Sequence, residues 1–305
     1  IGEVMAVCAM VMCMLFILVD LGRPDRFWHV IPFIGRLNFP QSILAWDVIV
    51  LNGYLLLNLH IPGYILYSHY RGRTPEKKYY LPVVFISIFW AISIHTVTAF
   101  LYSGLGGKPF WNTAILAPRF LISAFAGGPP LLLIVFTIIN KHWKNFQAKE
   151  SVFELLKKIT MVALPINMFL LFCELFKEFY TNSTHVASAQ YLFIGLHGHY
   201  MLVPFIWSAI IFGTWGCVVF LSPKLRNDPK YLLPTCAIVF IGIWIEKGMG
   251  LIVPGFIPSP LGSIVEYIPS VNEFFVCLAI WAFGALLFSL MVKAVIAILS
   301  KEIKE

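Results

Sequence analysis

Apolar residues along this chain fall in long blocks, and polar residues gather in short segments between the blocks. A soluble amphipathic helix differs, because its apolar positions return about every 3.6 residues. The blocks are long enough to cross a bilayer as helices that rise about 1.5 Å per residue. They predict eight membrane-spanning helices, at about residues 1–20, 42–67, 81–102, 114–140, 157–180, 200–222, 231–254 and 271–299. The expected fold is therefore an all-α polytopic membrane protein.

Composition excludes a soluble domain. Hydrophobic residues make up 59% of the 305 residues and charged residues only 12%, too few to cover a water-exposed surface. The first block, 1–19, lacks the basic start and the small-residue cleavage site of a secretory signal. Because the sequence begins without Met and already inside an apolar block, we expect further helices before it.

Charge predicts the orientation of the chain in the membrane. One set of polar segments is rich in Lys and Arg, namely 71–78, 141–158, 224–230 and 301–304. The segments on the other side hold few cations: Arg23, Arg26, Arg36 and Lys108. By the positive-inside rule, the first set is cytoplasmic and both ends of the sequence lie in the cytoplasm. We therefore expect a multi-pass protein of the cell (inner) membrane, with no nucleic-acid partner.

The segments on the outer side are also distinct in composition. Gly, Pro and aromatic residues are frequent in 21–41, 103–113, 181–199 and 255–270, where lysine is nearly absent. One interpretation is a docking surface for another subunit, and the other is an aromatic belt with turn residues at the membrane interface.

The chain shows no pattern for a metal or haem. Its six cysteines all lie inside apolar blocks without the close spacing that zinc or iron–sulfur clusters need. Bis-histidine haem requires two imidazoles at one depth. His60 and His95 are expected about 20 Å and about 10 Å below the outer surface, so their levels do not match.

Two ionisable residues near the outer surface predict a quinone site. Asp47 lies about one helical turn below that surface, and His95 lies on the next predicted helix. Placing an ionisable group within the hydrocarbon of a membrane costs free energy. Such residues are therefore rare there and are candidates for a function. A quinone needs an apolar slot, polar partners for its oxygens and a group that exchanges protons. The alternatives are a structural histidine and an aspartate that complements a helix dipole.

A second group of charges lies in the later helices. Its members are Glu174, Glu178, Glu246, Lys247 and Glu273. They are candidates for a proton path or, alternatively, for ion pairs that hold helices in register. Arg119 lies near the start of the fourth predicted helix. Its interpretations are a counter-charge for Asp47, a ligand of lipid phosphate, or an arginine whose side chain extends to the membrane interface. The charged segment 149–158 divides the helices into expected bundles at 1–140 and 141–305.

Three motifs in order resemble the NrfD/PsrC family of quinone-interacting membrane subunits. The first is DLGRPDRFWH at Asp20–His29, the second runs from Ile94 to Gly128, and the third is CELFKEFY at Cys173–Tyr180, followed by His185. In detail the chain looks most like the ten-helix DsrP, HmcC and QrcD types of sulfate-respiration complexes.

This resemblance implies two four-helix bundles without haem or metal, and menaquinone bound near the outer face of the first bundle. It implies a ferredoxin-like iron–sulfur subunit on the outer loops, a multihaem cytochrome c and other membrane subunits. In such proteins an Asp and a His or Tyr on the next helix face the quinone, which here would be Asp47 with His95 or Tyr102; Asp47 and His95 are the catalytic candidates. The quinone-binding candidates are Trp46, Asp47, His95, Tyr102, Arg119 and His29. Family members have helices before the one that ends in DLGRP, so this set of candidates is incomplete.

Three functional hypotheses follow. The first is a quinone-reactive electron-transfer subunit, which has no activity apart from its complex. The second is a proton carrier that works through the glutamates of the later helices. The third is a scaffold that only anchors redox subunits.

Overall fold

The computed structural model describes residues 1–305 except 32, 144–145, 183–185 and 301–305. His185, which follows the third motif, lies outside the described residues. The long helices are α1 (Gly2–Asp20), α2 (Ile43–Tyr70), α3 (Lys77–Ser103), α4 (Leu116–His142), α5 (Glu150–Thr181), α7 (Val203–Leu221), α9 (Pro229–Lys247) and α10 (Val271–Leu299). The shorter elements are η1 (Pro24–Val30), η2 (Pro109–Trp111), α6 (Val186–Phe193), α8 (Pro223–Arg226), η3 (Gly248–Ile252) and η4 (Val253–Phe256).

The expectation of an all-α polytopic membrane protein is confirmed. Among the described residues, eight helical segments are long and apolar enough to cross a membrane, and they correspond to the eight predicted ones. The fifth begins earlier than expected, at Glu150, so the charged segment 149–158 forms the N-cap, Lys149, and the first turns of α5. Its Glu, Lys and Leu residues favour helix, and Glu150 complements the positive end of the helix dipole.

The chain forms two compact units, which we describe separately. The first contains residues 1–98 and 268–305, and the second contains residues 99–267. This grouping differs from the expected bundles, because α4 packs against α5 and α9, whereas α10 packs against α1. The division into 1–140 and 141–305 stays a prediction.

In the first unit, α1 packs against both α2 and α10. Gly284 of α10 faces Met12 of α1, and a Cβ atom at Gly284 would overlap the Met12 Sδ. A small residue here lets the two helices approach closely, as is common between helices in membranes. The Trp90 indole of α3 donates a hydrogen bond of 2.9 Å to the Val50 carbonyl of α2.

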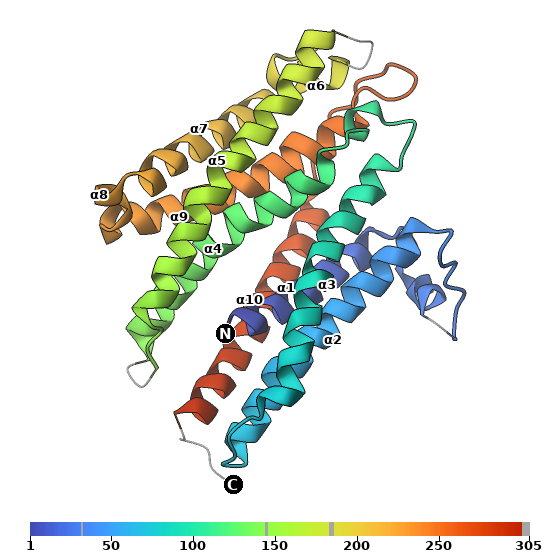
Figure 1. Cartoon of the computed structure of the whole chain (residues 1–305). Coiled ribbons are helices and arrows are strands. Elements are labelled where there is room, and N and C mark those ends of the chain that lie inside the picture. Colours follow the sequence, from blue (N-terminus) through green and yellow to red (C-terminus); the bar gives the residue numbers. More distant parts are fainter. Residues whose placement is uncertain (32, 144–145, 183–185, 301–305) are drawn as a thin grey trace. The chain divides into compact units, whose positions relative to one another are not determined.

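In the second unit, α4, α5, α7 and α9 lie side by side (Figure 1). One buried cluster, around Leu133, Leu164 and Phe220, lies between these helices. A second cluster joins the helices to η2 and α6, and Trp111 and Tyr191 lie at its centre. Large apolar side chains therefore fill both parts of this unit.

The span that contains α9 is irregular over its last turns. After Lys247 the chain continues as a π-helical turn, η3, and then as the 3₁₀ turn η4. The Trp111 indole donates a hydrogen bond of 2.8 Å to the Leu251 carbonyl in η3. Irregular backbone at membrane depth requires such partners, because lipid offers none. The irregularity begins next to Glu246 and Lys247, two of the predicted site residues.

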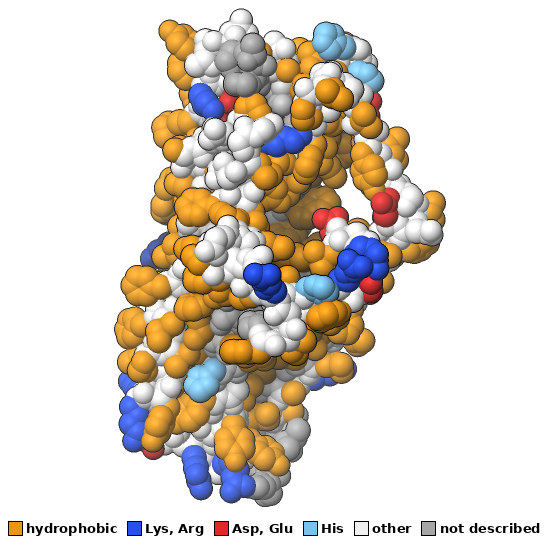
Figure 2. All heavy atoms as spheres, turned by 90° about the vertical axis from the view of Figure 1, so that its right-hand side faces the viewer, with side chains coloured by type: hydrophobic (Ala, Val, Ile, Leu, Met, Phe, Trp, Pro, Cys, Tyr) orange, Lys and Arg blue, Asp and Glu red, His pale blue; other side chains and the backbone are white. Residues whose placement is uncertain are grey.

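Large hydrophobic side chains lie on the surface of the molecule. They are spread over the face shown in Figure 2, between areas of other side chains and backbone. Many large ones are more than half exposed, for example Phe89, Phe169 and Phe274. Such a surface suits contact with lipid or with other membrane subunits.

Candidate functional site

A pocket of about 450 Å³ lies in the first unit, between α1, η1 and α2. Pockets for small organic ligands commonly have this size. The lining residues are Val11, Met14, Leu15, Ile17, Leu18, Leu21, Phe27, Val30, Ile31, Leu44, Asp47, Val48, Leu51 and Asn52. All are apolar except Asp47 and Asn52, which both come from α2. The pocket therefore has an apolar wall on α1 and its polar groups on α2.

Asp47 lies in the first two turns of α2 and is 5% exposed. The Thr98 hydroxyl of α3 is 3.5 Å from its Oδ1, a long hydrogen bond within the same unit. Asp47 thus combines an apolar surrounding with only one weak polar partner among the described side chains. A carboxyl group in this setting is suited to bind a polar atom of a ligand and to exchange a proton with it.

The other predicted quinone residues of the first unit have different surroundings. His95 is half-buried on α3 and is not among the lining residues. Trp46 is 41% exposed, and its indole donates a hydrogen bond of 2.8 Å to the Pro40 carbonyl, which fixes the turn before α2. His29 is exposed in η1, with its ring 3.9 Å from that of Trp28.

Tyr102 and Arg119 belong to the second unit. The Tyr102 ring packs against Trp111 at 5.1 Å and against Phe120 at 6.0 Å, so this tyrosine is part of an aromatic cluster.

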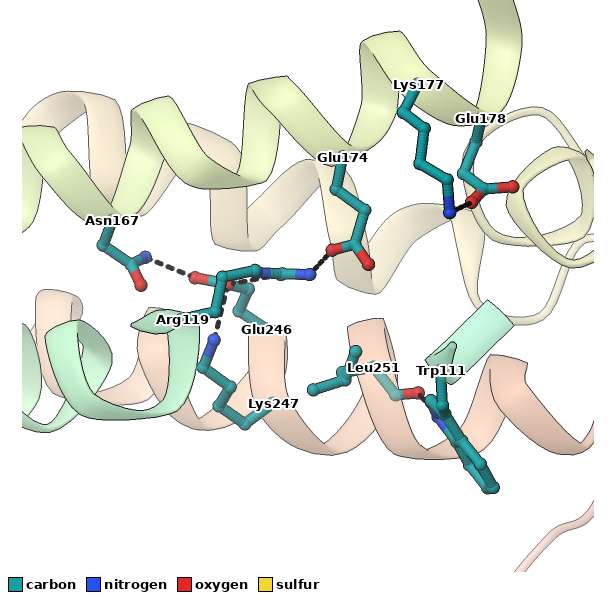
Figure 3. Close-up of polar contacts among 9 residues, drawn as sticks. All are labelled: Trp111, Arg119, Asn167, Glu174, Lys177, Glu178, Glu246, Lys247 and Leu251. Atoms are coloured by element: carbon teal, nitrogen blue, oxygen red, sulfur yellow. Dashed lines mark hydrogen bonds and ion pairs between the residues drawn. The ribbon is translucent and has the colours of Figure 1, made fainter. Parts of the chain in front are cut away.

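Arg119 lies at the centre of a buried ion-pair network, shown in Figure 3. Its guanidinium pairs with Glu174 of α5, and its Nη2 is 3.0 Å from the Glu246 Oε1 of α9. Lys247 Nζ lies 3.0 Å from the same oxygen, and Asn167 donates a hydrogen bond of 2.7 Å to the Glu246 Oε2. Two carboxylates and two cations therefore balance one another. Sequence reasoning proposed Asp47, lipid phosphate or the interface for Arg119, whereas the structure pairs it with two glutamates.

The remaining charges of the predicted proton path have other ion-pair and hydrogen-bond partners. Glu178 is buried and pairs with the half-exposed Lys177 at 3.0 Å. Glu273 lies in the first unit and caps α10, because its carboxylate accepts the Ser270 N–H at 2.6 Å. That reciprocal capping box explains the position of Glu273 without a role in proton transfer.

A polar cluster around Glu266 also connects segments of the second unit that lie outside its long helices. Glu266 Oε1 accepts hydrogen bonds of 3.1 Å from the Tyr191 hydroxyl and the Met201 N–H, and its Oε2 is 3.3 Å from the His199 Nδ1. Burial and the bond to Glu266 raise the pKa of Tyr191 to about 12. Desolvation raises the pKa of Glu266, but the bonds from Met201, His199 and Tyr191 outweigh it and lower this pKa.

Comparison with known families identifies the chain. The family model described as "Polysulphide reductase, NrfD" matches residues 1–257. The chain belongs to the NrfD family. The resemblance seen in the three sequence motifs is thereby confirmed at the level of the family.

Three named relatives are similar to this NrfD-family chain. The Hdr-like menaquinol oxidoreductase integral membrane subunit of Archaeoglobus fulgidus is 23% identical over 329 residues, covering all of this chain and 77% of that protein. A selenate reductase subunit of Mesobacillus selenatarsenatis is 22% identical, covering 56% and 46% respectively. The putative dimethyl sulfoxide reductase membrane subunit of Halobacterium salinarum is 23% identical, covering 84% and 60%. The chain thus spans about half to three quarters of the length of these proteins.

Within this NrfD-family chain, sequence reasoning missed Asn52 and Asn167. It considered charged residues within apolar blocks, but a neutral amide in hydrocarbon also needs a polar partner. The same rule applied to Asn would have found both residues. No group of three or more potential metal ligands occurs among the described residues; the absence of a metal or haem from this chain stays a prediction.

Proposed function

We propose that this chain is the quinone-reactive membrane subunit of a respiratory oxidoreductase complex, and that menaquinone or menaquinol binds in the pocket beside Asp47. The observation that carries the proposal is a buried carboxyl group in an otherwise mostly apolar pocket of about 450 Å³. The family and the menaquinol oxidoreductase subunit among the relatives support it. The fit is chemical, since the pocket offers an apolar slot with two polar side chains, Asp47 and Asn52.

In this proposal Asp47 accepts a proton from a ring hydroxyl when the quinol is oxidised, and donates it when the quinone is reduced. Each hydroxyl of a quinol loses one proton and one electron on oxidation. The electrons pass to a ferredoxin-like iron–sulfur subunit, and the protons leave toward the outer surface. His95, on the neighbouring α3, is proposed as the second proton-exchanging group.

We further propose that the pocket lies near the extracytoplasmic face of the cell membrane. The positive-inside distribution of Lys and Arg supports this orientation, which puts η1 outside. The exposed Phe27 and Trp28 of η1 are then available to a partner subunit on that side. A multihaem cytochrome c and further membrane subunits complete the proposed complex.

The test is a titration of the purified complex with a fluorescent quinol analogue. Asp47→Asn keeps the size of the side chain but removes the proton-exchanging group. We expect the affinity to fall tenfold or more, which corresponds to about 1.4 kcal/mol. Asp20→Asn is the matched control, because Asp20 is exposed at the end of α1 and does not line the pocket.

The possible results separate the hypotheses. Saturable quenching that weakens only in Asp47→Asn supports the proposed site. Equal binding by both variants and the unaltered complex moves the quinone away from Asp47. No saturable quenching in the unaltered complex overturns the quinone proposal and leaves a scaffold or a proton carrier.

One observation favours proton transfer in the second unit as a second candidate function. A cavity of about 10 Å³ touches Arg119, Glu174 and Glu178, and Glu174 Oε1 has no hydrogen-bond partner among the described atoms. This volume is close to that needed by one water molecule. A water there would connect Glu174 with Glu178. Glu174→Gln should then reduce charge movement in liposomes while quinol oxidation continues; unchanged charge movement would refute this role.

A further inference from the structure

Asn52 is the second polar residue of the Asp47 pocket. It lies nine residues after the first residue of α2, or about 13 Å along the helix axis. By the sequence-based placement of α2 in the membrane, this is within the hydrocarbon. An amide group at that depth is unfavourable unless its polar atoms have partners.

The described hydrogen bond of Asn52 uses only part of its capacity. Its Nδ2 donates to the Val48 carbonyl at 2.8 Å. An amide carries two N–H donors and one acceptor oxygen, so one N–H and the oxygen are left for a ligand. The bond also turns the amide back toward the helical turn of Val48, which itself lines the pocket. The free polar atoms of Asn52 and the Asp47 carboxyl are therefore presented to the same space.

The spacing along α2 suits a ligand with polar atoms at opposite ends of a ring. Asp47 and Asn52 are five residues apart, which is about 7.5 Å along the helix axis. The two positions are also about 140° apart around the helix, so what places both side chains at one ligand is that both line the same pocket. The facing wall offers no competing polar partner, because the α1 residues that line the pocket are apolar, including Met14, Leu15 and Leu18.

We propose that Asn52 binds one ring oxygen of the quinone while Asp47 binds the other. This inference rests on the proposed function of the pocket. A carbonyl oxygen accepts the free N–H of Asn52, and a quinol hydroxyl donates to its amide oxygen, so the residue serves both redox states. Asn52 then sets the orientation of the ring, and Asp47 exchanges the proton.

Asn58 provides a matched control on the same helix. Its Nδ2 donates to the Tyr54 carbonyl at 2.8 Å, the same local bond that Asn52 makes to Val48. Asn58 does not line the pocket. Asn52→Leu and Asn58→Leu therefore remove the same side-chain bond and replace the amide by an apolar group of similar size, but only the first changes the pocket.

The experiment titrates the purified complex with the fluorescent quinol analogue for each variant. We expect Asn52→Leu to weaken binding fivefold or more and Asn58→Leu to weaken it less than twofold. Asn52→Gln keeps an amide and should recover part of the affinity. If Asn52→Leu prevents assembly, Asn52→Ser provides the same comparison with a smaller side chain.

The outcomes distinguish this inference from the proposed function. If Asp47→Asn weakens binding but Asn52→Leu and Asn52→Ser bind like the unaltered complex, the role of Asn52 is wrong and the quinone site stands. If both asparagine positions have equal effects, Asn52 acts on the helix rather than on the ligand and the inference is again overturned. If the unaltered complex shows no saturable binding, the proposed function itself fails.

Discussion

Arg119 and Glu246 are 127 positions apart in the sequence, yet Arg119 Nη2 lies 3.0 Å from the Glu246 Oε1 inside the second unit. Both side chains are almost completely buried, with 2% and 4% exposed. The pair joins α4 to α9, and Glu174 extends it to α5. Buried charges of this kind contribute little net stability as a pair, but removing one partner is costly because the other is left in an apolar surrounding.

We therefore expect Arg119→Met to destabilise the protein strongly. The substitution keeps an apolar stem of similar length but leaves Glu174 without its cation and Glu246 with only Lys247 and Asn167. The expected loss is about 3–5 kcal/mol, measured as a lower thermal unfolding midpoint of the purified complex. Arg36→Met is the control, because Arg36 is exposed. Equal midpoints for the two variants would contradict a structural role of the network.

The sequence was sufficient to predict the helices but not the ion-pair network around Arg119. A membrane-spanning helix is encoded locally by the length of an apolar block, so all eight spans were predicted. The partners of Arg119 depend on how α4, α5 and α9 pack, which no local pattern specifies. Asp47 was predicted as a site residue from its depth and its charge and stays a prediction, whereas Asn52 was missed because it carries no charge. The irregular turns after Lys247 were not anticipated either, since Gly248 and Gly250 leave several backbone conformations open.

A second prediction concerns the hydrogen bond between Trp111 and the Leu251 carbonyl. Trp111 is fully buried, so Trp111→Phe leaves that carbonyl without its donor and also leaves a small void. We expect a loss of about 1–3 kcal/mol in the thermal unfolding of the complex. Trp46→Phe removes a similar bond to Pro40 at an exposed position and should cost less than about 0.5 kcal/mol. A larger loss of stability at Trp46 than at Trp111 would show that burial does not determine how much these hydrogen bonds contribute to stability.

A third prediction follows from the contact between Gly255 and the same indole. A Cβ atom at Gly255 would overlap the Trp111 ring, which is rigid and enclosed. Gly255→Ala should therefore displace the ring, weaken its bond to Leu251 and cost about 1–3 kcal/mol. The tryptophan fluorescence of the complex should change as well. Gly63→Ala is the control, because nothing lies within 4 Å of its added Cβ, and it should be neutral or stabilising.

The last prediction concerns pH and the cluster of hydrogen bonds around Glu266 in the second unit. Its hydrogen bonds lower the pKa of Glu266 below its ordinary value of 4.5. A carboxyl group with a lowered folded-state pKa stabilises the protein fully above its ordinary pKa, and this contribution is lost as the pH falls through the lower, folded-state pKa. The unfolding midpoint should therefore fall below about pH 4.5 more steeply in the unaltered complex than in Glu266→Gln. Parallel curves for the two proteins over pH 7 to pH 3 would mean that Glu266 is not the group that titrates. Asp25→Asn is the control in the first unit. Asp25 also has a lowered pKa, from its bond to Arg23, but its side chain is 57% exposed, against 27% for Glu266, so solvent screens this pair and the curve should stay unchanged.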